Sequence, residues 1–355
     1  MTMRARSDFL RRLNAVRRVR AGLRGWGGVG AMAVVCVLAV AFVLLLPLTQ
    51  SRGEGGAALG GQRTVQGTQA RAPECDEATV QNQSPSPSDA DGATIDAIKA
   101  RGVLKVGIDQ NSYRWGYRNP NSSSGDLEGF DIDLVTAIAK NIFGDSYTAN
   151  SVQFLAIPTN QRIPAVQDKQ VDMVVRTMTI TCDRAGQVAF SAPYFLTGQQ
   201  VLAPKASTIT GYDKSLAGKR VCSASGSTAN DRLTDDKASG KLPASVKILP
   251  PVANQLDCLV ELQLGQADAV VTDGALAASQ AAQDPTVELK GTTFTTEYYG
   301  VAMNKDATDL VRRVNRILES YRTSPDGWRA SYTKWLLPTL GKDSESADPP
   351  TPHYT

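Results

Sequence analysis

The strongest constraint on the fold is a repeated change between short apolar runs and longer amphipathic runs. It begins near residue 93 and ends near residue 340. The apolar run at 103–108 predicts a buried strand, and Asp131 opens a helix whose apolar residues fall on one face. Short strands that are separated by helices favour α/β layers with mainly parallel strands.

The same pattern restarts after Lys205, so a second α/β unit is enclosed by the first and by a final return of the chain. This order predicts two lobes. We expect lobe 1 to contain residues 93–203 and 300–340 and lobe 2 to contain residues 204–299. Two crossovers would act as hinges, near Val201–Ala203 and near Tyr299–Met303.

The N-terminal part of the chain has a separate character. Residues 1–26 hold eight arginines against one aspartate, whereas 25–51 carry no charge and 31–47 are almost wholly apolar. About 20 apolar residues form a helix long enough to cross the ~30 Å hydrocarbon core of a membrane. The positive-inside rule then places the rest of the chain outside the cytoplasm. We expect a cytoplasmic segment at 1–26, a transmembrane helix at 27–49 and a single-pass membrane anchor, with a cleaved signal peptide as the alternative.

Two polar segments flank the predicted lobes. Residues 50–92 are rich in Gly, Ser, Gln, Pro and Thr, and residues 341–355 have a similar composition. Such segments bury too little apolar surface to offset the entropy of ordering. We expect a flexible tether at 50–92 and a disordered tail at 341–355.

Beyond the apolar segment lie four cysteines, which allow three disulfide pairings: Cys75, Cys182, Cys222 and Cys258. We favour Cys222 with Cys258, which closes a loop inside lobe 2. Cys75 with Cys182 would then fix the tether to lobe 1. Disulfides fit an extracytoplasmic location, and free buried thiols are the alternative.

Four stretches in a fixed order carry a resemblance to a known family. They are GVLKVG at 102–107, GFDIDL at 129–134, a Thr-x-Thr-x-x-x-x-Arg run at 177–184 with FSAPY at 190–194, and SGST at 225–228. With them, residues 93–340 resemble the extracytoplasmic solute-binding proteins, family 3, which serve ABC-type uptake of polar amino acids. The cysteine distribution resembles that of actinobacterial members. The resemblance implies a two-lobed, periplasmic-binding-protein-like fold of type II.

The resemblance also implies a site for the α-carboxylate of an amino acid. An arginine binds a carboxylate through two parallel hydrogen bonds, and Arg184 is the candidate, with Thr177 and Thr179 beside it. Ser227 and Thr228 enter a predicted helix, where N–H groups and hydroxyls face an anion. The alternatives are a surface arginine at a helix start and a simple N-cap at SGST.

Asp273 ends a predicted strand at the position that takes the α-ammonium in this family, and a helix N-cap is its alternative role. For the ligand side chain, Arg162 has the spacing at which glutamate/aspartate binders hold the distal carboxylate. Thr159 lies beside it, and Arg176 supplies a second cation or a structural ion pair. Asp109 occupies a position where glutamine binders carry aspartate, or it orients an arginine. Glutamate or aspartate is favoured, with asparagine and glutamine close behind.

Three aromatic residues in the loop after the first strand either stack on the ligand or pack at the lobe edge: Tyr113, Trp115 and Tyr117.

A binding protein is the predicted class, without a cofactor or metal. The only histidine is His353 in the tail, and a cluster of catalytic or metal-binding residues is not visible in the sequence. A dehydratase-like enzyme on the same fold, with Asp109 as an acid–base group, is the alternative. The expected partners are an amino acid, an ABC permease or a membrane sensor, and the membrane, but not nucleic acid.

Overall fold

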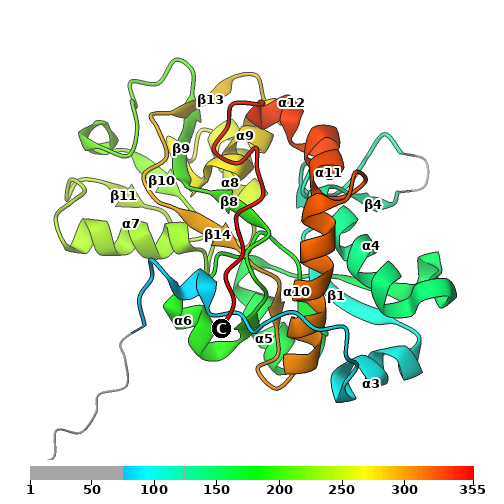
Figure 1. Ribbon diagram of the computed structural model, residues 1–355. Coiled ribbons are helices and arrows are strands. Elements are labelled where there is room, and N and C mark those ends of the chain that lie inside the picture. The colour runs from blue at the N-terminus through cyan, green and yellow to red at the C-terminus, as the bar shows by residue number, and fades with distance from the viewer. Residues whose placement is uncertain (1–74, 123–124) are drawn as a thin grey trace, which may run out of the picture. The chain divides into compact units, whose positions relative to one another are not determined.

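The computed structural model describes residues 75–122 and 125–355, which belong to one compact unit (Figure 1). The basic segment at 1–26 and the expected transmembrane helix at 27–49 lie outside the described residues. Among the residues that are described, no helix combines the length and apolar character needed to span a membrane.

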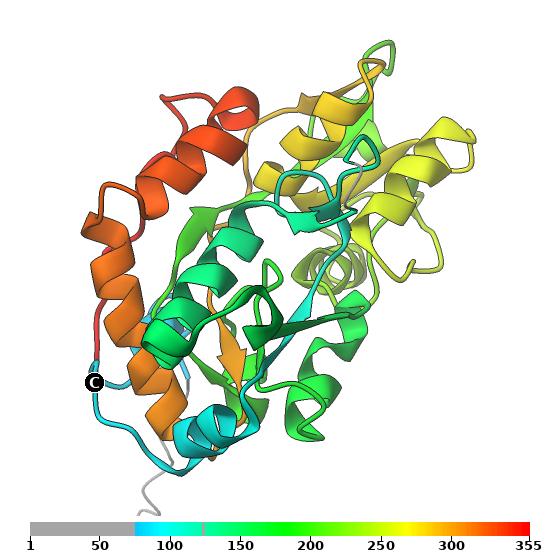
Figure 2. The same ribbon diagram turned by 90° about the vertical axis from the view of Figure 1, so that its right-hand side faces the viewer.

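Lobe 1 is built on a five-stranded sheet with the order β5-β1-β6-β15-β7. Its strands are β5 (Val152–Ala156), β1 (Leu104–Ile108), β6 (Met173–Val174), β15 (Ala302–Met303) and β7 (Ala189–Phe190). Its helices are α3 (Ala93–Arg101), α4 (Phe130–Phe143), α5 (Arg162–Gln167), α6 (Cys182–Gln187), α10 (Thr308–Thr323), α11 (Trp328–Trp335) and α12 (Leu337–Leu340). In Figures 1 and 2, α10 runs along the outside of lobe 1 beside α3 and α4.

Lobe 2 repeats this architecture on a second five-stranded sheet with the order β11-β10-β12-β9-β13. Its strands are β11 (Lys247–Ile248), β10 (Arg220–Cys222), β12 (Ala269–Asp273), β9 (Gln199–Pro204) and β13 (Val287–Lys290). Its helices are α7 (Thr228–Ala238), α8 (Gln255–Gln263) and α9 (Gly274–Gln283). Buried apolar side chains line each sheet, so each lobe has its own core.

The two lobes are joined by an antiparallel pair of short strands, β8 (Phe195–Thr197) and β14 (Glu297–Tyr299). The first hinge was expected at Val201–Ala203, but these residues lie inside β9 and pair with β12 and β13 in lobe 2. The expectation was wrong because 195–204 contains two short apolar runs on either side of Thr197–Gln200, and the sequence does not show which of the two joins the lobes. The second expected hinge, Tyr299–Met303, overlaps β14 only at Tyr299.

The expectation of mainly parallel strands is confirmed for strand direction, because four of the five strands in each sheet run the same way, although not every pairing is parallel. In each five-stranded sheet two pairings are parallel and two are antiparallel. The antiparallel pairings all involve β9 or β15, the strands that follow the two hinge strands. A chain that arrives from the other lobe enters the sheet from the opposite end, so its strand runs against the helix-connected ones.

Of the expected flexible tether at 50–92, residues 50–74 lie outside the described residues. Residues 75–92 are ordered, and so is the expected disordered tail at 341–355. Asn315 on α10 donates to the Oγ atom of Ser84 over 2.7 Å, and Ser84 donates to the carbonyl of Phe190 over 2.9 Å. Thr355 pairs with the first segment through its N–H to Ser84 and its carbonyl to Ser86. Hydrogen bonds order both polar segments, and the first is also held by the buried side chain of Val80.

Both favoured disulfides are confirmed. Cys222 is bonded to Cys258 between β10 and α8, and Cys75 is bonded to Cys182 at the first residue of α6. The second disulfide fixes the chain near residue 75 directly to a short helix of lobe 1.

Candidate binding site between the lobes

Two buried arginines of lobe 1 direct their guanidinium groups at one atom of lobe 2. Arg162 at the start of α5 donates from Nη2 to the carbonyl oxygen of Gly226 over 3.2 Å, and Arg184 on α6 donates to the same oxygen over 3.1 Å. Gly226 has φ +72°, and a Cβ atom added to it would lie only 2.9 Å from the Cα atom of Asn160. Glycine therefore permits this contact between the lobes.

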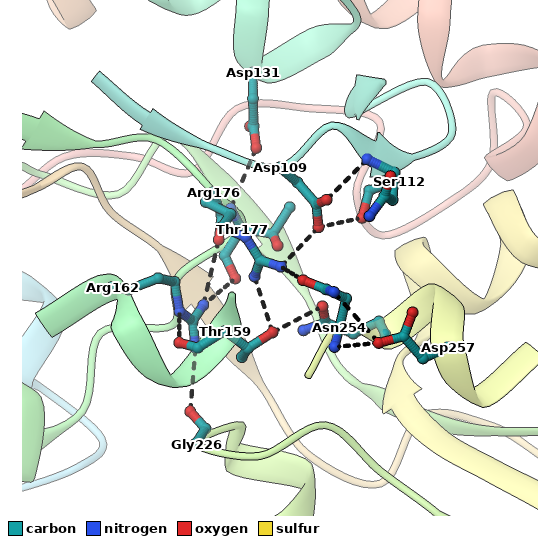
Figure 3. Close-up of polar contacts among 12 residues, drawn as sticks. Asp109, Ser112, Asp131, Thr159, Arg162, Arg176, Thr177, Gly226, Asn254 and Asp257 are labelled. Atoms are coloured by element: carbon teal, nitrogen blue, oxygen red, sulfur yellow. Dashed lines mark hydrogen bonds and ion pairs between the residues drawn. The ribbon is translucent and has the colours of Figure 1, made fainter. Parts of the chain in front are cut away.

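The other contacts of the two arginines are also carbonyl oxygens. Arg162 donates to the carbonyls of Thr159 (2.9 Å), Arg176 (3.3 Å) and Thr177 (3.3 Å) (Figure 3). Arg184 donates to the carbonyl of Thr179 over 2.8 Å. Within residues 75–122 and 125–355, neither guanidinium forms an ion pair.

Burial makes this arrangement costly for a cation. Arg162 is 3% and Arg184 is 6% exposed. Burial holds the pKa of Arg162 well below its usual range, and repulsion from Arg184 and Arg176 lowers it further. Burial also lowers the pKa of Arg184. Removing cations from water without a counter-ion is expensive, so the pair favours an anion between the lobes.

Local structure fixes α6, which carries Arg184. Thr181 caps this helix, because its side chain accepts a hydrogen bond from the N–H of Arg184 over 3.3 Å. Glu77 accepts from the N–H of Cys182 over 3.1 Å, beside the disulfide to Cys75. The terminal segment thus helps to position the arginine-bearing helix.

Thr177 holds an unusual backbone conformation at this site. Its φ is +41°, which is a strained value for a β-branched residue. Its N–H donates to Oδ2 of Asp131 over 3.2 Å, and the hydroxyl of Tyr194 donates to Oδ1 over 2.9 Å. Burial raises the pKa of Asp131 to about 7. Asp131 was predicted only as a helix start, although its place in the GFDIDL motif was a usable signal.

Arg176 has a different role from the other two arginines. It is fully buried, and its Nη2 atom lies 2.9 Å from Oδ2 of Asp109. Asp109 also accepts hydrogen bonds from the N–H of Asn111 and the hydroxyl of Ser112, each over 2.9 Å. The geometry therefore agrees with a structural ion pair, in which Asp109 orients Arg176.

Asp273 lies at the end of β12 and is buried between the lobes. It accepts a hydrogen bond from the hydroxyl of Tyr299 over 2.5 Å, and its side chain does not cap α9. Burial, followed by the charge of Glu297, raises the pKa of Asp273 to about 7.

Glu297 on the hinge strand β14 is a second buried acid that sequence reasoning missed. Its carboxylate accepts hydrogen bonds from Gln199 (2.9 Å), Thr295 (3.0 Å) and Thr228 (3.3 Å). Glu297 lies in no recognisable sequence motif. It reaches the site only because the hinge strands β8 and β14 pair with each other.

A small cavity between the lobes brings together seven of the ten predicted site residues: Arg162, Thr177, Thr179, Arg184, Ser227, Thr228 and Asp273. Ser227 is also an N-cap, since its Oγ atom accepts from the N–H of Asn230 over 3.1 Å. Thr159, Asp109 and Arg176 do not line this cavity, and they form a polar network with one another (Figure 3).

The aromatic residues of the first loop contribute mainly to packing. Trp115 is fully buried, and its ring centroid lies 4.8 Å from that of Phe195. Tyr117 donates to Glu128 over 2.7 Å. Tyr113 packs edge-on against Tyr117 and lines a small separate cavity between the lobes.

Two lobes that close on a buried, charged cavity are the architecture of a protein that binds a small solute. The chain belongs to the bacterial extracellular solute-binding proteins, family 3, whose model matches residues 104–338. The matched relatives are binding proteins of amino-acid transport and not enzymes.

Three relatives illustrate the match. The chain is 34% identical over 244 residues to the ABC transporter glutamine-binding protein GlnH of Bacillus subtilis, which covers 68% of this chain and 84% of the relative. It is 29% identical over 267 residues to the glutamate-binding protein GluB of Corynebacterium efficiens, covering 71% and 83%. An ancestral arginine-binding protein bound to glutamine is similar in structure, with a TM-score of 0.58, 34% identity and coverage of 66% and 98%.

Proposed function

We propose that this protein binds an acidic amino acid, L-glutamate or L-aspartate, outside the cytoplasm and delivers it to an ABC permease. The observation that carries the proposal is the pair of buried guanidinium groups, Arg162 and Arg184, that face only carbonyl oxygens. Two cations together with the carboxylate of Asp273 complement a ligand that has two carboxylates and one ammonium.

Each charged group has a proposed role. Arg184 binds the α-carboxylate, with Thr177, Thr179 and the first turn of α7 as further donors. Asp273 binds the α-ammonium, and Arg162 binds the distal carboxylate. A permease partner and an extracytoplasmic location follow from the family, and glutamate is what the Corynebacterium relative is named for binding.

A neutral amide ligand, glutamine or asparagine, is the second candidate. It is favoured by Glu297, whose negative charge lies close to Arg184 and would balance one of the two cations. The Bacillus relative is named for binding glutamine. Anchoring through residues 27–49, and service to a membrane sensor in place of a permease, are further proposals that rest on the sequence alone.

The test is calorimetric titration of the full-length protein with all twenty amino acids. We expect glutamate or aspartate to bind with a Kd far below 100 μM, a value that corresponds to about 5.5 kcal/mol. N-acetyl-L-glutamate is the control, because it keeps both carboxylates but lacks the ammonium that Asp273 would bind. Tighter binding of glutamine than of glutamate would select the second candidate, and failure of all twenty would refute both.

Binding should also depend on pH through Asp273. The proposed ammonium contact requires the ionised carboxylate, and the pKa of Asp273 is raised to about 7 by burial and by Glu297. We therefore expect the affinity for glutamate to fall as the pH is lowered from about 8 to about 6, and Asp273→Asn to bind weakly at both pH values. A wild-type affinity that is flat across this range would contradict the assignment. Any pH dependence that survives in the variant belongs to Asp131, whose pKa is also about 7.

The stability of the ligand-free protein should change in the opposite direction. Because the pKa of Asp273 is raised on folding, its stabilising contribution is complete below the unfolded value of 3.8 and is lost as the pH rises through about 7.

A further inference from the structure

The start of α8 in lobe 2 forms three hydrogen bonds with buried residues of lobe 1 (Figure 3). The N–H of Thr159 donates to the carbonyl of Ala253 over 3.1 Å, and its hydroxyl donates to the side-chain oxygen of Gln255 over 3.2 Å. Arg176 donates from Nη2 to Oδ1 of Asn254 over 3.0 Å. Thr159 is 2% exposed and Arg176 is fully buried, so these contacts are shielded from water.

Both ends of the Arg176–Asn254 contact are held by acids. On the lobe 1 side, Asp109 pairs with Arg176 over 2.9 Å. On the lobe 2 side, Asn254 is the N-cap of α8, and its N–H donates to Asp257 over 2.9 Å in a capping box. The resulting series of acid, arginine, amide and acid crosses the gap between the lobes. A hydrogen bond from a charged donor is stronger than a neutral one, particularly where water is excluded.

The same residues also touch Arg162. The carbonyl of Thr159 accepts from Nε of Arg162 over 2.9 Å, and the carbonyl of Arg176 accepts from its Nη1 over 3.3 Å. Arg162 therefore takes its position from two residues that are themselves bound to lobe 2. Thr159, Arg176 and Asn254 do not line the central cavity, whereas Gln255 does.

We propose that residues 253–255 form a latch, which binds Thr159 and Arg176 to hold the lobes closed and to position Arg162. Gln255 also lines the ligand cavity, whereas Asn254 acts from outside it. Asn254 is a positioning residue in this arrangement. The inference rests on the proposed function for the identity of the ligand, but closure itself does not depend on that identity. A protein that is closed for a smaller fraction of the time has a proportionally weaker apparent affinity.

Asn254→Ser is the decisive variant. Serine keeps the N-cap of α8 but is too short to reach Arg176, so the helix is retained while the contact between the lobes is lost. Asn304→Ser is the matched control, because Asn304 makes its hydrogen bonds to the carbonyls of Val166 and Gln167 inside lobe 1. Two quantities are measured on the full-length protein: the Kd for L-glutamate and for L-glutamine, and hydrogen exchange of the peptide 157–161 without ligand.

We expect Asn254→Ser to weaken binding about tenfold by the same factor for both amino acids, and to accelerate exchange at 157–161, where the Thr159 amide crosses to lobe 2. Asn304→Ser should change neither quantity. Unchanged exchange, or a loss confined to one of the two ligands, would overturn the latch. If neither amino acid binds the wild-type protein, the proposed function fails, and the exchange experiment still decides whether the latch exists.

Discussion

Replacing Arg184 by alanine is expected to eliminate measurable binding of every amino acid that the wild-type protein binds. The α-carboxylate is common to all of them, and the proposed site gives it one buried arginine held by the carbonyl of Thr179. Truncating one partner of a buried charge pair costs about 2–5 kcal/mol, which corresponds to a loss of about 30-fold to several thousandfold. This loss is measured by calorimetric titration with the amino acid that binds the wild-type protein most tightly.

Two further variants make this result specific. Arg184→Lys keeps the charge but loses the two parallel hydrogen bonds, so we expect intermediate affinity. Arg316→Ala removes an exposed arginine of α10 and should leave binding unchanged. If Arg184→Ala retained affinity within about threefold and remained folded by calorimetric melting, the assignment of the α-carboxylate would be wrong.

The second large effect is on selectivity. Arg162→Ala should weaken glutamate binding on the order of 100-fold and glutamine binding only a few-fold, because only glutamate presents a distal carboxylate. Arg162 also binds the carbonyl of Thr159, so the variant weakens closure for both ligands. Dividing the loss of glutamate affinity by the loss of glutamine affinity removes the effect of weaker closure, which is the same for both ligands. Equal losses for glutamate and glutamine would remove Arg162 from the selectivity site.

Local patterns predicted the two lobes, and the resemblance to the family supplied most of the residues that line the cavity. Alternating strands and helices define each lobe, and the run at 177–184 brings Thr177, Thr179 and Arg184 to one strand end. The distinction between Arg162 and Arg176 was not predictable. It arises because Arg176 pairs with Asp109 and also meets Asn254, a residue 78 positions away in the other lobe, whereas Arg162 forms no ion pair in the described part of the chain.

The hinge boundaries and Glu297 were missed for a related reason. The pairing of β8 with β14 joins residues about a hundred positions apart, and an apolar run looks the same whether its partners lie in one lobe or in the other. Periodicity records which face of an element is buried, but not which distant segment buries it.

The attachment of the termini has a mechanical consequence. Cys75 is bonded to α6, and Thr355 is paired with Ser84, so both ends of the described chain are fastened to lobe 1. Lobe 2 is inserted between the hinge strands and carries neither end. A force applied to the chain ahead of Cys75 would be transmitted to lobe 1 through the disulfide between Cys75 and Cys182. Lobe 2 then carries none of that load, because the disulfide at Cys75 attaches the chain to lobe 1.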